Sequence, residues 1–155
     1  MAVSILSIYR YIQGVADNII NTFDNLNPIK IVESLNRVDF KIIPLTDSVN
    51  GFYNYISPNR QAIVINENLI GENFNITLFH ELSHYFLGHT NTLLLNSSIT
   101  SNIKEEYHAD LLATCLYLEY VKRHRDYDEI QYPKRVCELM KYFTWITVAF
   151  VAVYF

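Results

Sequence analysis

Apolar side chains recur at every third or fourth position through the first part of the chain, which is the spacing of one helix face. This pattern predicts an amphipathic helix over residues 4–25. A second helix is predicted directly after it, because Asn27 can cap its first turn and Pro28 suits its first helical position. The apolar positions of the first helix are Ile5, Ile8, Tyr9, Ile12, Val15, Ala16, Ile19, Ile20 and Phe23.

Three segments rich in β-branched and aromatic residues follow, with turn residues between them. Residues 38–45, 52–56 and 61–66 are the predicted strands. The last two are joined by the short turn 57–60, which contains a proline and an asparagine, so an antiparallel hairpin is expected.

Helical spacing returns near residue 78, in a segment whose start Asn75 or Thr77 is expected to cap and whose end Gly88 is expected to mark. Its apolar stripe consists of Leu78, Phe79, Leu82, Phe86 and, as a core residue, Tyr85. A polar loop is predicted over 90–102, where it can form a lid or a substrate wall.

The last third of the chain is predicted to be helical. A long helix is expected over 103–123, a link over 126–132, and a final helix that Pro133 opens. The uncharged tail 142–155 is shorter than the roughly 20 residues that span a bilayer. It is therefore expected to be a buried helix or strand, or a contact between copies in a homo-oligomer, rather than a membrane anchor.

These elements predict one α+β domain over 1–155, with an N-terminal helix within 1–26 and a small antiparallel or mixed sheet packed against helices. The chain has 155 residues and a net charge of −4, and its one short basic run, 122–125, is typical of a solvated helix end. Direct binding to nucleic acid is not expected. Two distant cysteines, Cys115 and Cys137, and the lack of an export signal favour a reduced, cytoplasmic protein, with one disulfide as the alternative.

The chemistry of the chain is concentrated in His80-Glu81-Leu82-Ser83-His84, a His-Glu-x-x-His sequence. On a helix, His80 and His84 lie on one face and can bind one metal ion together. Glu81 stands beside them and can act as the general base toward a water held by a zinc ion. The apolar stripe around these residues favours the helical placement that this site needs.

Two histidines leave a zinc site incomplete, so a third ligand must come from elsewhere. His89 is about half a turn away from His80 on a continuous helix, which favours a helix-end or supporting residue. Glu106 and Asp110 share a face of the next predicted helix. Glu106 is the expected ligand, Asp110 the expected partner of a ligand's free imidazole N–H, and Glu105 the alternative ligand.

The strand "AIVIN", the helix "ITLFHELSHYFLGH" and the helix "EEYHADLLATCL" occur in this order. In this, residues 27–120 resemble the ImmA/IrrE family of small gluzincin metallopeptidases. The resemblance implies a zincin-like fold, one Zn²⁺ held by His80, His84 and Glu106, Glu81 as the base, and Asp110 at the position after Ala. It further implies cleavage of a repressor with a helix-turn-helix domain, in a phage, mobile-element or stress-response system. The family's Phe-Ala is replaced by Leu111-Leu112-Ala113.

Peptide hydrolysis also needs a donor for the tetrahedral oxyanion. Tyr107, His108 and His89 are the candidates for this role or for substrate contact, and the sequence favours none of them. The alternative function is a non-catalytic, metal-binding regulatory module whose apolar C-terminal surface binds a partner. A structural zinc site usually has four protein ligands, often cysteines. The predicted site contains no cysteine, so the peptidase is the favoured interpretation.

Overall fold

The computed structural model describes residues 2–90, 99–124, 134 and 138, and within them the chain forms an α+β fold with a small mixed sheet. The elements run in the order α1 (Ala2–Thr22), α2 (Pro28–Ser34), β1 (Val38–Ile43), β2 (Gly51–Ser57), β3 (Arg60–Asn66), α3 (Gly71–Phe86) and α4 (Ile99–His124). The link 126–132, the helix expected after Pro133 and the tail 142–155 lie outside the described residues. Among the helices that are described, none has the length and apolar character needed to cross a bilayer.

The first two helices form as their patterns predict. Ile12, Ala16 and Ile19 give α1 its buried face, and the helix ends at Thr22, three residues earlier than expected. Asn27 caps α2, since its side-chain oxygen accepts hydrogen bonds from the amides of Ile29 and Lys30, and Pro28 occupies the first helical position.

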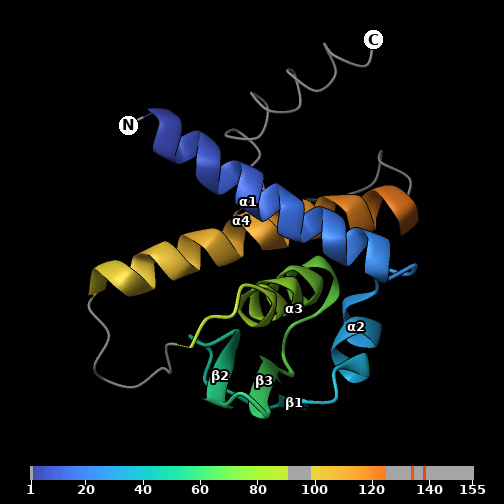
Figure 1. Cartoon of the computed structure of the whole chain (residues 1–155). Helices are drawn as coiled ribbons and strands as arrows, with labels where there is room; N and C mark the ends of the chain where they lie inside the picture. The colour runs from blue at the N-terminus through green and yellow to red at the C-terminus, as the bar shows by residue number, and fades with distance from the viewer. Residues whose placement is uncertain (1, 91–98, 125–133, 135–137, 139–155) are drawn as a thin grey trace.

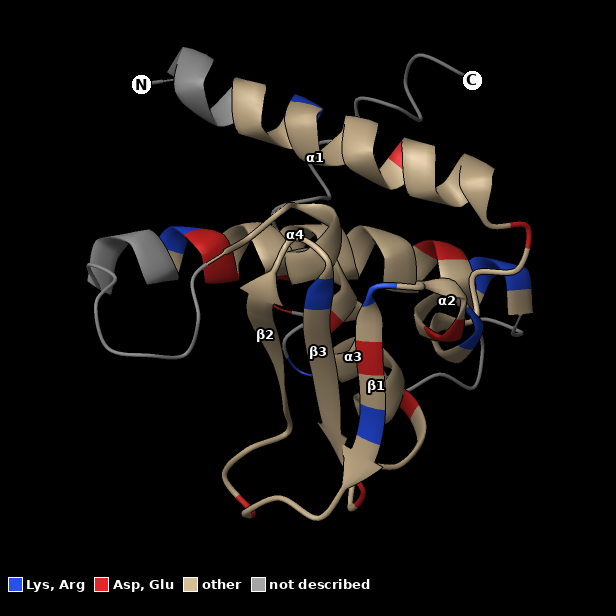
Figure 2. Cartoon of the chain, turned by 60° about the horizontal axis from the view of Figure 1, so that its bottom comes forward, with Lys and Arg blue, Asp and Glu red and all other residues tan. Residues whose placement is uncertain are grey.

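The sheet has the strand order β1-β3-β2, with β3 in the middle (Figure 2). β2 and β3 form the predicted antiparallel hairpin, while β1 runs parallel to β3. The inward side chains of the sheet include Ile63 and Ile65, which are fully buried. Because β2 is an edge strand beside α3, its backbone can reach residues of that helix.

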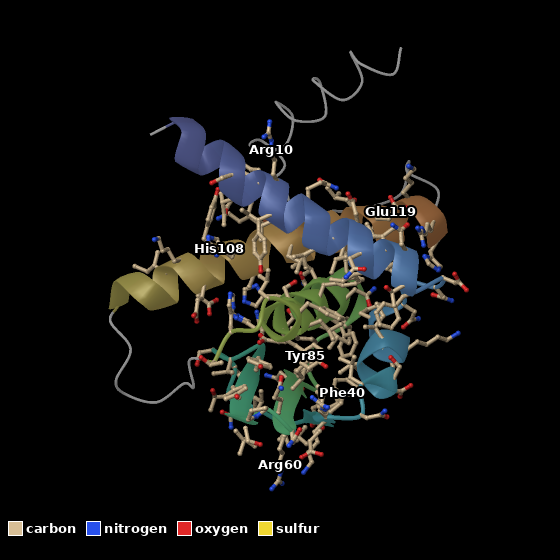
Figure 3. The ribbon with its side chains drawn as sticks, in the orientation of Figure 1. Arg10, Phe40, Arg60, Tyr85, His108 and Glu119 are labelled. Carbon is tan, nitrogen blue, oxygen red and sulfur yellow. The ribbon has the colours of Figure 1, made fainter. Side chains whose placement is uncertain are left out.

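The helices lie in layers over the sheet: α3 packs on the strands, α4 lies across α3, and α1 lies on the far side of α4 (Figure 1). This order places α3 at the centre of the core, where Leu78, Phe79 and Leu82 are fully buried. Tyr85 also packs against the core, as expected, and Figure 3 shows it with Phe40 between α3 and the sheet. The other buried core residues include Leu26, Ile31, Val32, Leu111, Leu112, Leu116 and Tyr117.

Two helix starts differ from the sequence prediction. α3 begins at Gly71, so Asn75 and Thr77 lie inside the helix and cap nothing; Ile70 holds the cap position without a side-chain hydrogen bond. Gly71 has φ 58°, which lets the chain turn sharply into the helix without a polar cap. α4 begins at Ile99, so 99–102, which were expected to belong to a loop, are helical, while 91–98 lie outside the described residues. Apolar periodicity starts only at Ile103 and therefore missed the first turn.

Candidate metal centre

His80 and His84 face the same way from α3, one turn apart. Their Nε2 atoms are 3.2 Å apart, and their rings meet edge to face with centroids separated by 4.9 Å. α3 holds this pair firmly because the opposite side of the same turns, Leu78 and Leu82, is fully buried in the core. His84 is itself buried, whereas the His80 side chain is 20% exposed, so the pair opens to solvent on one side.

Glu106 completes the cluster from α4. Its carboxylate oxygens lie 3.1 Å from Nε2 of His80 and 3.3 Å from Nε2 of His84. The three residues form a group whose potential ligand atoms all lie within 4.8 Å of one another. Glu105, the alternative ligand, is outside this group. Packing of α3 against α4 therefore brings together the three residues that the sequence predicted as ligands.

The spacing of these atoms suits a tetrahedral metal ion. With metal–ligand bonds of about 2.0–2.1 Å, two ligand atoms at a tetrahedral angle lie roughly 3.3 Å apart. The separation of 3.2 Å between the two Nε2 atoms is close to that figure, and one oxygen of Glu106 lies 3.1 Å from Nε2 of His80 and the other 3.3 Å from Nε2 of His84. Two imidazoles and one carboxylate are also a ligand set that leaves a fourth position open. The residues thus fit a catalytic type of metal site.

Asp110 lies one turn after Glu106 on α4 and contacts the other nitrogen of His80. Its Oδ1 atom is 3.0 Å from Nδ1, so Nε2 is left to point at the cluster. Burial lowers the pKa of His80, but the hydrogen bonds to Asp110 and Glu106 outweigh it and raise the pKa to about 10. Hydrogen bonds from His80 and His84 hold the pKa of Glu106 well below its usual value. The metal-free cluster therefore carries a proton that a metal ion would displace.

His89 lies behind His84 rather than beside the open position. The two Nδ1 atoms are 2.8 Å apart, and both side chains are buried. Burial, and then the neighbouring His84, lower the pKa of His89 to about 4, so it is neutral near pH 7. The contact with His84 agrees with the predicted helix-end, supporting position.

Glu81 is buried beside the candidate ligands, and burial raises its pKa. The backbone N–H of Tyr53, on the edge strand β2, donates to its carboxylate. The ring of Tyr53 also stacks on His84, with centroids 5.9 Å apart, and its hydroxyl donates to Gln61. Sequence reasoning missed Tyr53, since it contributes mainly a backbone group and only the sheet places it there.

The comparison with known families agrees with this geometry. The model of the IrrE N-terminal-like domain, Peptidase_M78, matches residues 36–152. The chain belongs to this family. The match begins later and extends further than the resemblance noted in the sequence, and it leaves α1 and α2 outside. No curated protein sequence matches the chain.

Membership of a peptidase family supports a metallopeptidase-like role for the protein, and His80, His84 and Glu106 form a group that could hold a metal ion. A cavity of about 550 Å³ adjoins these residues in the IrrE-like domain. Outside the His-Glu-x-x-His motif, the side of the cavity formed by α3, the start of β2 and the residues just before each of them has no charged side chain. The residues that line it there are Asn50, Gly51, Leu69, Asn73, Ile76 and Thr77. Sequence reasoning did not select them, although Asn73, Thr77 and His80 have helical spacing that places them on one face.

Tyr107 and His108, the other two oxyanion candidates, lie on α4 next to Glu106. The hydroxyl of Tyr107 is 2.9 Å from that of Tyr9 on α1, so this side chain links two helices of the domain. His108 is partly buried on α4, where burial lowers its pKa, and the nearby Lys104 adds to this (Figure 3). Neither residue lines the cavity described above.

Proposed function

We propose that this protein is a zinc-dependent endopeptidase. The observation that carries the proposal is the convergence of the His80 and His84 Nε2 atoms on the Glu106 carboxylate, at separations of 3.1–3.3 Å. Buried Glu81 next to this cluster, and membership of a peptidase family, support a catalytic site over a structural one. A structural zinc site would be closed by a fourth protein ligand.

The roles follow from the chemistry of each side chain. When bound, Zn²⁺ lowers the pKa of a water molecule toward neutrality and polarises the scissile carbonyl. Glu81 would accept the proton of the attacking water and deliver it to the leaving nitrogen. Its raised pKa brings the carboxyl closer to the working pH, which suits a group that must both take and give a proton. The oxyanion donor is left unassigned among Tyr107, His108 and other groups.

The substrate would be a protein. The Glu106 side chain is 60% exposed, so the cluster is accessible to an extended segment of a large molecule. The motifs His80-Glu81-x-x-His84 and Glu106-x-x-Ala-Asp110 resemble those of the ImmA/IrrE family, which implies a helix-turn-helix repressor in a phage, mobile-element or stress-response system. Such a repressor would be met in the cytoplasm.

Elemental analysis of the purified protein after zinc reconstitution tests the metal assignment. We expect about one zinc per chain in the wild type and in Glu81→Gln, and loss of zinc in Glu106→Ala. Wild-type protein without zinc, or Glu106→Ala with a full zinc complement, would contradict the ligand set.

Cleavage is tested by incubating the zinc-loaded protein with helix-turn-helix repressors encoded near its gene and following the products by mass spectrometry. Wild type should cut one of them at a defined bond, and Glu81→Gln, which keeps its zinc, should not. Equal cleavage by both proteins would show that Glu81 is not the base or that a contaminating protease acts. No cleavage of any repressor by fully zinc-loaded wild type would overturn the substrate proposal while leaving the metal assignment intact.

A further inference from the structure

The end of α3 folds back on itself at Gly88. This residue has φ 68°, a left-handed conformation that stops the helix. The amide of Gly88 donates to the carbonyl of Tyr85, and the amide of His89 donates to the carbonyl of His84 at 3.0 Å. This pair of bonds is the Schellman pattern of a glycine-terminated helix.

The fold-back changes where His89 points. On a continuous helix, five residues correspond to about 500° of rotation, which would direct His89 away from His84. Because the helix stops at Gly88, the imidazole of His89 instead returns to His84, and the two Nδ1 atoms lie 2.8 Å apart. In this motif an apolar contact commonly joins the same two positions, but here two imidazoles occupy them.

The geometry limits which tautomers would suit a bound metal ion. Nε2 of His84 faces Nε2 of His80 and the carboxylate of Glu106, so it is the nitrogen that is free to bind metal. With a metal ion on Nε2, Nδ1 of His84 would carry the hydrogen and would donate it to Nδ1 of His89. His89 can accept only as a neutral ring that holds its own hydrogen on Nε2.

We propose that the helix end Gly88-His89 is a positioning device for the metal ligand His84, resting on the metal site proposed above. His89 fixes the tautomer and the ring orientation of His84, as Asp110 does for His80, but as an uncharged acceptor. Three carboxylates, from Glu81, Glu106 and Asp110, already lie at or around the metal cluster. A neutral imidazole holds the second ligand without adding a fourth negative charge beside buried Glu81.

Zinc affinity tests the role of His89. We would measure the zinc dissociation constant by competition with a chromogenic chelator, and the absorption spectrum of the Co²⁺-substituted protein. His89→Leu should bind zinc about 10–100-fold more weakly than wild type and change the Co²⁺ spectrum. His89→Gln, whose amide oxygen can still accept from Nδ1 of His84, should recover most of the affinity. His124→Leu, at the far end of α4, is the matched control and should bind as wild type does.

The role of the helix end is tested by substituting Gly88, which is not one of the candidate metal ligands. A Cβ at this position would meet no neighbour, so the only obstacle to substitution is the left-handed backbone. Gly88→Asn, a residue that tolerates this conformation, should keep zinc affinity, whereas Gly88→Val should weaken it by disturbing His89. Thermal melting of the metal-free variants would show whether each is folded.

The outcomes separate this inference from the proposed function. If the wild type bound neither zinc nor Co²⁺, both the proposed function and the positioning role would be wrong. If the wild type bound zinc and His89→Leu bound it equally tightly, only the positioning role would be wrong. The role would also be wrong if His89→Gln bound as weakly as a folded His89→Leu, since hydrogen-bond acceptance would then not be the property that matters.

Discussion

Asp110 and Glu106 contact opposite nitrogens of the same imidazole. The Asp110 carboxylate is 3.0 Å from Nδ1 of His80, and the Glu106 carboxylate is 3.1 Å from Nε2. The two acids are four residues apart on α4, so side chains from one face of this helix contact both nitrogens of His80. α4 therefore supplies a candidate ligand and also orients another one, and the register between α3 and α4 determines the shape of the site.

Asp110 is predicted to act through His80. Asp110→Leu removes the acceptor of the Nδ1–H bond and should weaken zinc binding about 10–100-fold. Asp110→Asn keeps an acceptor oxygen without the charge, so its loss should be smaller. Isothermal titration with zinc, at one pH and buffer, gives both values. Equal affinity of Asp110→Leu and wild type would exclude the role.

Glu106 and Glu105 provide a matched pair for the third ligand. Glu106→Gln removes the charged oxygens next to both histidines, so its loss of zinc affinity should exceed that of the Asp110 variants. Glu105→Gln makes the same chemical change one residue earlier, outside the cluster, and should bind zinc as wild type does. Inductively coupled plasma analysis after dialysis measures the zinc content of both variants. If Glu105→Gln lost zinc and Glu106→Gln kept it, Glu105 would be the ligand instead.

The candidate ligands could be chosen from sequence because their spacing carries the information. His80 and His84 are set by helical periodicity alone, and Glu106 and Asp110 by the same rule on a second helix. The contact between the two helices is tertiary. Predicting it required only the assumption that a long second helix packs against the first. The predicted zinc identity, base and substrate stay predictions that the experiments above address.

Other parts of the site depend on backbone events that periodicity does not encode. Tyr53 reaches Glu81 through its N–H because β2 is the edge strand beside α3. His89 reaches His84 because a left-handed glycine ends the helix. The sequence predicted this end at Gly88, but the direction of His89 was judged as if the helix continued. The parallel pairing of β1 with β3 was likewise not determined by the short, apolar character of the strands.

The pH dependence of metal binding follows from His80. In the metal-free protein its pKa is about 10, so it is protonated at neutral pH and zinc must displace that proton. Apparent zinc affinity should therefore rise between pH 6 and 8, by up to tenfold per pH unit. In Asp110→Leu the pKa of His80 should fall and the slope should flatten. A pH-independent affinity for wild type would contradict the protonated state.

Stability of the metal-free protein should show the opposite trend. A histidine whose pKa is raised on folding stabilises the fold fully below its unfolded value of about 6.5, and this contribution disappears as the pH approaches 10. The free energy of unfolding attributable to His80 thus decreases over that interval. Urea titrations of the wild type and of His80→Gln at several pH values isolate the contribution of His80. If the free energies of unfolding of the two proteins changed in parallel with pH, the predicted contribution would be refuted.

The bond between Tyr9 and Tyr107 should couple α1 to the part of α4 that carries Glu106. The two hydroxyls are 2.9 Å apart and partly buried. Tyr9→Phe and Tyr107→Phe should each lower the free energy of unfolding, and a double-mutant cycle should give a coupling of about 0.5–1.5 kcal/mol. Tyr11→Phe, on the exposed side of α1, is the control. A coupling near zero would mean that the two helices do not depend on this bond.

Asn66 is expected to hold the loop between β1 and β2. Its side chain is buried, its amide nitrogen is 2.9 Å from the carbonyl of Val49 and 3.3 Å from that of Thr46, and its oxygen accepts from the amide of Asn68. The loop leads directly into Asn50 and Gly51, which line the cavity beside the metal cluster. The buried side-chain amide of Asn66 thus fixes the loop that leads to one wall of the cavity.

Asn66→Asp should therefore destabilise the fold by about 2–3 kcal/mol, because an aspartate cannot donate to the two loop carbonyls and leaves them facing a carboxylate. Asn68→Asp makes the same change at an exposed neighbour and should stay within about 0.5 kcal/mol of wild type. Chemical denaturation measures both. Zinc affinity of folded Asn66→Asp should remain that of wild type, since every candidate ligand comes from α3 or α4; a loss of zinc would show that the loop supports the metal cluster as well as the cavity wall.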